Sequence, residues 1–431
     1  MTRSIRNFLG THNLLAVSAN YQETALNTEQ ALDTTMLVDL NTVLTYRALK
    51  AANRDEMTGK EEADRVYDLG GTVSGNLAFP RAQPQHFAFL LAYALGEVET
   101  NALGGSGFRH AIRPRTGEVD AARSNPSFTA AMRFGKQVMK RRFTSCFIDQ
   151  VRVELAKEGW AKINGAVKGT GKVTDNTQVE SVAAAYNAGS LRLAANGVEG
   201  ADAAERLSNV HAVKVLNPVT EVWEEVSYTA VSGEAPAVIT ITPPGGSGEM
   251  TAYRVYYLPT ESGWTVFPPR VEEPPLKVSQ AMVNLGGRWN GSEFQGGCAL
   301  GAELRKLVWN FRNHLTPELT PGLGADYAGR AFRAGREQKL EIDRDFRDFL
   351  MAQHLKENDY LGLYLKAAGP EIEPGVNYQV ELVFPRVAVV AAPVRVAQRR
   401  LAEEVEFAIL EDDAYGSVVA YVQNKVSGYA A

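Results

Sequence analysis

Apolar and polar residues alternate along most of this chain, and glycine or proline interrupts the alternation at short intervals. Alternation has the period of a β-strand with one buried face, and the interruptions are typical of turns. The pattern therefore predicts a mainly β protein. The segments expected to be strands are residues 66–79, 108–113, 127–134, 147–155, 160–167, 210–216, 222–228, 237–241, 253–258, 278–285, 304–311, 338–342, 361–366, 378–384, 387–394, 403–410 and 417–422.

Two segments have the period of a helix instead. The first opens at Pro84, is very apolar, and meets Gly96 where a C-terminal glycine is favoured, so it predicts a helix over 84–95. The second covers 345–355, where the apolar residues lie on one stripe and Asp343 or Asp345 can cap the first turn. Residues 174–187 are expected to form a short linking helix.

The order of these elements occurs twice. In each half a strand leads into one short helix, and two strands and a long hairpin follow; the helices are 84–95 and 345–355. Such a repeat predicts a duplicated unit. One helix covers one face of a sheet, so each unit is expected to be a β-sandwich or a partial barrel. Duplicated units of this kind suit closed rings, in which each sheet continues into its neighbour without a free edge.

A third region differs from both halves. Residues 188–265 are rich in β-branched residues and turn signals, and two proline pairs follow at 268–269 and 274–275. Proline-rich segments are stiff spacers. We therefore expect a first unit over 1–187, an inserted small β-domain over 188–265, and a second unit over 266–431.

The composition limits the number of domains and the classes of protein to consider, but it does not indicate a binding partner. The chain has 431 residues, 45% hydrophobic and 22% charged, with a formal net charge of −5. Two to three domains and no strong nucleic-acid footprint are expected from these values. No segment is apolar enough over 18 residues to predict a membrane span, and the first ten residues do not predict a signal peptide.

Motifs of catalysis are absent from the sequence. It has no G-x-S-x-G, no phosphate-binding P-loop and no H-E-x-x-H. The glycine pairs are expected to form turns, and the histidines, including His86 and His354, lack the spacing of metal ligands. Cys146 precedes an apolar strand and is expected to lie in a core, far in sequence from Cys298. We predict no catalytic, cofactor-binding or metal-binding residues, and no enzyme.

Charged clusters allow more than one interpretation. Glu403, Glu404, Glu406 and residues 411–413 could hold a metal, form a carboxylate pair, present a solvated face or repel DNA. Glu404 and Glu406 alternate with apolar residues, so a solvated strand face is the expectation we favour. The short basic runs at 136–140, 141–142 and 399–400 lack interleaved aromatic residues and are expected to be subunit contacts or solvated charges.

Six segments share a pattern of strands and glycines around one helix: residues 278–301 (VSQAMVNLGGRWNGSEFQGGCALG), 326–330 with Gly335 and Arg336, 361–370, 71–77 leading into 84–96, 128–133 and 146–169. In this pattern they resemble the tail tube proteins of long-tailed, siphophage-type phages. They cover about two-thirds of the chain, in two blocks. The chain departs from the commoner single-unit pattern by its duplication and by the 188–265 insertion.

The resemblance implies a structural virion protein. Subunits of the family join their inner sheets into a barrel-shaped lumen, and the rings stack into the tube through which DNA leaves the capsid. Expected partners are further copies of the chain and the tail terminator, distal tail and tape-measure proteins; DNA passes without specific binding, and no membrane or cofactor is involved. Assembly in the host cytoplasm and a place in the virion tail follow.

Ring stoichiometry depends on how many units line the lumen. If both do, three chains form a pseudo-sixfold ring; if one does, six are needed, and we favour three. An acidic lumen would oppose sticking of DNA. Loops at 51–65 and 315–326 are expected to protect strand edges before assembly. Alternatives are another tail, capsid, baseplate or secretion-system tube component, and, from a different class, a secreted carbohydrate-binding β-protein or β-sandwich enzyme.

Overall fold

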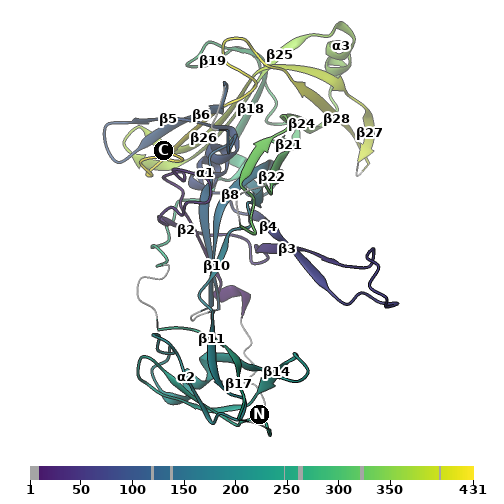
Figure 1. The fold of residues 1–431 in the computed structure, drawn as a ribbon. Helices are drawn as coiled ribbons and strands as arrows, with labels where there is room; N and C mark the ends of the chain where they lie inside the picture. Colours follow the sequence, from purple (N-terminus) through teal and green to yellow (C-terminus); the bar gives the residue numbers. More distant parts are fainter. Residues whose placement is uncertain are drawn as a thin grey trace. The chain divides into compact units, whose positions relative to one another are not determined.

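The computed structural model describes residues 9–117, 121–135, 139–246, 248–260, 266–320, 325–397 and 399–431. Within these residues the protein is mainly β, as the sequence predicts, with the helices α1 (Pro84–Leu95), α2 (Ala203–Asn209) and α3 (Leu350–Glu357) (Figure 1). Short 3-10 turns cover Gly10–His12 and Val278–Gln280. The strands form several open sheets, and no closed barrel occurs in the described part of the chain.

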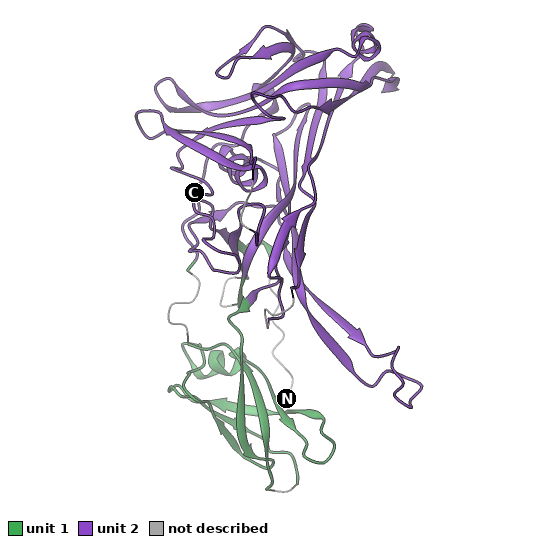
Figure 2. Cartoon of the chain, turned by 45° about the horizontal axis from the view of Figure 1, so that its top comes forward, with its two compact units in different colours: residues 1–14, 131–142, 174–266 green, residues 15–130, 143–173, 267–431 purple. Residues whose placement is uncertain are grey.

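The chain divides into two compact units (Figure 2). We call residues 1–14, 131–142 and 174–266 the small unit, and residues 15–130, 143–173 and 267–431 the main unit. The small unit thus begins at 174 in its longest segment, before the expected insertion boundary at 188. The division into two duplicated units around an insertion remains a prediction.

The small unit is built from two sheets. One sheet has the order β11 (Gln178–Ala185), β17 (Met250–Tyr257), β13 (Val210–Leu216) and β14 (Trp223–Val226); the other has β12 (Ser190–Arg192), β16 (Val238–Ile241) and β15 (Tyr228–Val231). Their buried faces share one apolar core that includes Val213, Ile239 and Val255. Asp202 caps α2, a helix that the sequence pattern did not reveal, by accepting from the Glu205 amide at 2.8 Å.

Two sequence predictions in this region are wrong. The linking helix expected at 174–187 is instead the end of β10 (Val173–Asp175) and the whole of β11. Pairing of every β11 residue with β17, and packing of Val182 and Ala184 on the core, outweigh its alanine-rich helical propensity. The strand expected at 222–228 is two strands, β14 and β15, which belong to different sheets.

The main unit contains one long antiparallel ladder. Its strands pair in the order β3, β4, β9, β8, β21, β24, β28 and β27. Their bounds are β3 Leu44–Ala52, β4 Val66–Phe79, β9 Lys162–Gly169, β8 Met139–Ala156, β21 Leu304–Arg312, β24 Glu337–Asp345, β28 Arg400–Ile409 and β27 Val394–Ala397. The remaining strands outside the second sheet are β1 Leu14–Val17, β2 Thr34–Met36, β7 Phe128–Phe134, β19 Phe294–Gln295, β20 Cys298–Ala299, β22 Leu315–Glu318 and β23 Arg330–Arg333.

A second sheet branches from the ladder at β26 (Val376–Ala391). Gln379–Val383 of β26 pairs with β29 (Val419–Asn424), whereas Val387–Ala391 pairs with β28. The second sheet continues through β6 (Phe108–Pro114) to β5 (Gly96–Ala102) on one side, and through β25 (Tyr360–Glu373) to β18 (Ala281–Trp289) on the other. The two strands expected at 378–384 and 387–394 are therefore mainly one long strand that changes its partner.

Helix α1 has the predicted bounds and is wholly buried. The ring of His86 stacks on Phe79 of β4 at 4.1 Å between centroids, and the side chain of Leu90 lies over Gly165 of β9. The Tyr93 hydroxyl donates to the Ser18 carbonyl at 2.7 Å. At the other end Gly96 adopts φ 95°, the left-handed conformation that favours glycine at this position.

Helix α3 begins later than predicted. Its N-terminal residue is Leu350, and Asp343 and Asp345 lie in β24 and cap nothing. The cause is strand pairing, because β24 stays registered with β28 as far as Asp345 opposite Ala402. The helix has one buried residue, Met351.

Candidate assembly surface

The ladder of the main unit consists of two blocks that are connected in the same way. In block 1, β3 and β4 form a hairpin, α1 follows β4, and β9 of the later β8–β9 hairpin pairs with β4. In block 2, β21 and β24 pair, α3 follows β24, and β28 of the later β27–β28 hairpin pairs with β24. Both blocks contain a strand that leads into one short helix, as the sequence predicts, while the duplication of a whole unit remains a prediction.

Blocks 1 and 2 join inside the chain by pairing of β8 with β21. On the buried face Leu307, Trp309 and Phe311 of β21 lie opposite Leu155, Val153 and Val151 of β8. All six side chains are essentially buried. On the other face the carboxylate of Glu154 of β8 lies 3.2 Å from Arg152. It lies 4.0 Å from Lys306 of β21, at the outer limit of an ion pair. We call this pairing the internal seam.

The two ends of the ladder are unpaired edges. Within the described residues β3 pairs with β4 alone, and β27 pairs with β28 alone. Large apolar side chains are exposed at both places. At one end they are Leu49 of β3 and, on the neighbouring strand β4, Val66, Tyr67 and Leu69. At the other end they are Val394 and Val396 of β27, with Leu401 of β28 and Val390 of β26. Exposed apolar edges promote association with another strand, and proteins normally keep them short or charged.

One face of the ladder carries mainly polar side chains, with Val308 of β21 as an apolar exception opposite Glu154 and Glu341. Residues alternate strictly in β24, where Leu340, Ile342 and Arg344 are buried and the intervening residues are partly exposed. Register carries this face across the ladder, because Glu341 lies opposite Glu406 and Asp343 lies opposite Glu404. At these four positions of β24 and β28 the face carries only carboxylates.

Charge on this polar face is shared unevenly, because the acidic side chains lie mainly in block 2 whereas the basic side chains lie in both blocks. Acidic side chains lie on β24 and β28, with Glu154 of β8 as the exception; they are Glu154, Glu337, Glu341, Asp343, Asp345, Glu404 and Glu406. Basic side chains lie mainly on β3, β9, β8 and β21; they are Arg47, Arg152, Lys162, Lys168, Lys306, Arg312, Lys339 and Arg395. The face is therefore not acidic as a whole.

The predicted acidic cluster is split by the structure. Glu404 and Glu406 lie on the polar face as expected, and they contact Arg395 at 3.5 Å and Lys339 at 3.2 Å. Glu403, grouped with them in the sequence, points to the buried side, where its side chain is 1% exposed and 2.7 Å from Arg344. Alternation alone separates Glu403 from its neighbours, because adjacent residues of a strand face opposite ways.

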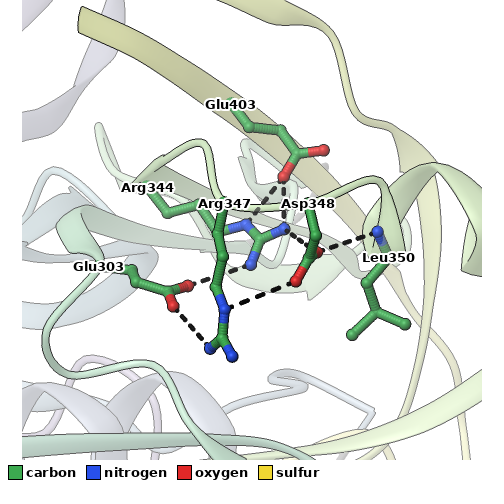
Figure 3. A network of polar contacts seen from close by, with 6 residues as sticks. All are labelled: Glu303, Arg344, Arg347, Asp348, Leu350 and Glu403. Carbon is green, nitrogen blue, oxygen red and sulfur yellow. Dashed lines mark hydrogen bonds and ion pairs between the residues drawn. The ribbon is translucent and has the colours of Figure 1, made fainter.

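The pair of Glu403 and Arg344 is the centre of a network that positions α3 (Figure 3). Arg344 also contacts Glu303 at 3.2 Å and Asp348 at 3.6 Å, and Arg347 lies 2.9 Å from Glu303. Asp348 accepts from the Leu350 amide at 3.1 Å, at the first residue of the helix. The network thus connects β24 and β28 to the start of α3.

The histidine, cysteine and arginine residues singled out in the sequence do not lie together in one site. His86 is buried, and burial lowers its pKa to about 3. Cys146 lies in the core as expected, whereas Cys298 is exposed. Arg141 pairs with Asp175 in the small unit. The described residues contain no group of three or more potential metal ligands, and no helix in them is long and apolar enough to span a membrane.

Parts of two predicted features lie outside the described residues. These are residues 136–138 of the basic run and residues 321–324 of the loop expected at 315–326. The described start of that loop is β22, which pairs with β23. The predicted loop at 51–65 is mainly the turn of the β3–β4 hairpin.

Sequence reasoning missed the branch of β26, the internal seam and the two unpaired edges. Alternation marks a strand but does not name its partner, so these features had no signal in the sequence. Comparisons with known proteins give no further assignment: no protein-family model matches the sequence, and no curated protein matches it.

Proposed function

We propose that this protein is a ring-forming structural protein, and that stacked rings of it make the tail tube of a long-tailed phage. The observation that carries the proposal is the ladder of two equivalent blocks with an unpaired apolar edge at each end. The resemblance of the sequence segments given above to tail tube proteins adds the biological setting.

The direction of the strands is compatible with ring closure. In block 1 they are β3, β4, β9 and β8, and in block 2 they are β21, β24, β28 and β27, all antiparallel to their neighbours. An even number of alternating strands leaves β27 antiparallel to the β3 of a following copy. Head-to-tail addition can therefore repeat without a change of pairing type until the ring closes.

The internal seam supplies the model for the seam between copies. It places β8 at the end of block 1 against β21 at the start of block 2. The proposed seam places β27 at the end of block 2 against β3 at the start of the next block 1. Two blocks in each chain favour three copies in a pseudo-sixfold ring over six.

The polar face is the proposed lumen wall. Its opposite face is the core of the main unit, so only the polar face is available to a water-filled channel. The distribution of charge revises the expected acidic wall, because basic side chains of both blocks lie on the same face as the acidic residues of β24 and β28. In this form of the proposal the mixed charges keep attraction to a phosphate backbone weak and local.

A seam variant tests the proposal. Val394→Glu with Val396→Glu adds charge to the unpaired edge, and Val219→Glu is the control, at a more exposed valine of the small unit. The wild type and the control should form rings or tubes in negative-stain images, while the seam variant should remain monomeric in sedimentation velocity with an unchanged melting temperature. A wild-type protein that stays monomeric at high concentration would overturn the proposal.

A further inference from the structure

Four arginines of the main unit gather at one place. We call Arg115, Arg123, Arg333 and Arg336 the arginine cluster; Arg115 follows β6, Arg333 ends β23, and Arg336 precedes β24. The guanidinium groups of Arg333 and Arg336 both donate to the backbone oxygen of Arg115, at 3.2 and 2.5 Å. Two cations thus share one uncharged acceptor, although each guanidinium can donate five hydrogen bonds.

The cluster forms no ion pair among the described residues, although Glu97 and Glu411 attract Arg115 and Arg336 from farther away. Its other acceptors are also uncharged: Arg333 lies 3.5 Å from the Asn125 side-chain oxygen, and Arg123 donates to the Glu23 backbone oxygen. The Nε atom of Arg336 is buried and has no acceptor there. Burial and repulsion by Arg333 lower the Arg336 pKa to about 10, with Glu411 acting weakly in the opposite direction. The cluster remains charged at neutral pH, and its residues Arg333 and Arg336 are partly exposed and form no ion pair within the described part of the chain.

The chain also carries exposed carboxylates on a hairpin that extends away from the rest of the main unit (Figure 1). We call residues 53–65, which join β3 to β4, the arm tip. Asp64 of the arm tip is paired with Lys60, and Glu56 accepts from Tyr67. Glu61 and Glu62 are exposed, and neither forms an ion pair within the described part of the chain.

We propose that the arginine cluster is a docking site for the arm tip of a second copy, with the carboxylates of Glu61 and Glu62 accepting from Arg333 and Arg336. Arginine presents a planar pair of donors that matches a carboxylate, and such charge-assisted bonds are stronger than those to the uncharged acceptors it now uses. The inference rests on the proposed assembly, and it adds a contact that is separate from the seam between β27 and β3.

Charge reversal on both sides tests the docking. One variant carries Arg333→Glu and Arg336→Glu, and the other carries Glu61→Lys and Glu62→Lys. Each alone should associate at least about tenfold more weakly in sedimentation velocity, because like charges then meet. An equimolar mixture should regain association, since each variant's arm then complements the other's cluster.

Controls separate charge from folding. Arg192→Glu and Glu234→Lys reverse exposed charges in the small unit and should leave association unchanged. Arg333→Gln with Arg336→Gln removes the charge but keeps amide donors, and it should weaken association in the same direction by a smaller factor. Melting temperatures of all variants should agree with the wild type before association is compared.

Three outcomes would overturn the docking. The first is that the reversed variants associate as tightly as the wild type. The second is that they associate more weakly but the mixture does not recover. The third is that Glu118→Gln with Asp120→Asn, which removes the carboxylates that follow Arg115 in the sequence, causes the same loss of association although the arm tip is unchanged. In each case the wild type still assembles, so the proposed ring survives. A wild type that never associates overturns both.

Discussion

Blocks 1 and 2 of the main unit have the same connections but hold their helices by different means. Every residue of α1 is buried, and its contacts are mostly apolar and aromatic. Helix α3 has one buried residue and is tied at its start by the charged network around Arg344. A shared topology therefore does not fix the type of interaction that stabilises it. Block 1 should respond to changes of volume, and block 2 to changes of charge.

The largest effect is expected from Arg344→Met in block 2. The substitution leaves Glu403 buried without its cation, which typically costs about 3–5 kcal/mol. Adding Glu403→Leu removes the stranded charge and should recover much of the loss, because an apolar pair often replaces a buried ion pair without cost. Urea denaturation of the single and double variants measures both. Equal stability of the single variant and the wild type would contradict the role given to the network.

Truncation in block 1 should cost nearly as much. Leu90→Ala opens a cavity beside Gly165 in a helix with no exposed residue, at a cost of about 2–5 kcal/mol. The matched change on the other helix is Leu350→Ala, where the side chain is 46% exposed, and it should stay within about 0.5 kcal/mol. Denaturation midpoints compare the two. Similar losses would mean that α3 is packed more like α1 than its exposure indicates.

A pH effect is expected at the start of α1. Glu273 accepts from the Gln85 amide at 2.7 Å, and burial raises its pKa from 4.5 to about 7. The folded state then binds the proton more tightly than the unfolded state, so this contribution is complete below about pH 4.5 and is lost as the pH rises to about 7. The size is on the order of 3 kcal/mol.

Glu273→Gln removes the pH-dependent contribution of Glu273 to the free energy of unfolding. Buried His86 has the opposite effect, because its lowered pKa costs stability as the pH falls below 6.5. The measured quantity is therefore the difference between wild type and variant across pH 4 to 8, which cancels the histidine. A difference that does not change with pH would show that the Glu273 pKa is not raised.

The smallest effect concerns two glycines. A Cβ at Gly165 of block 1 would lie 2.5 Å from Leu90, so Gly165→Ala should cost about 1–3 kcal/mol. A Cβ at Gly301, before β21 of block 2, meets nothing within 4 Å, so Gly301→Ala should be neutral or stabilising by up to about 1 kcal/mol. Thermal melts rank the two. Combining Gly165→Ala with Leu90→Ala should cost less than the sum, since the smaller side chain makes room.

Local signals predicted what was locally determined. Proline at the first turn, an apolar run and a glycine in the left-handed region placed α1 at its observed bounds. Most strands of the ladder were found by alternation. Partner choice was not, because pairing of β24 with β28 delayed α3, and pairing of β11 with β17 replaced a helix by a strand. The burial of Glu403 had a signal in the alternation of β28, but its partner, 59 residues away in sequence, did not.

The internal seam changes the cost of building the proposed ring. Each association of free molecules loses translational and rotational freedom worth about 4–15 kcal/mol. Joining β8 to β21 within one chain removes that loss at every second seam, because the partner strand is already present at a high effective concentration. The same covalent link lets the two blocks diverge in sequence while their stoichiometry stays fixed at one to one. In a ring of three such chains, block 1 and block 2 therefore alternate around the lumen. A ring of six identical single-block chains could not have this alternation.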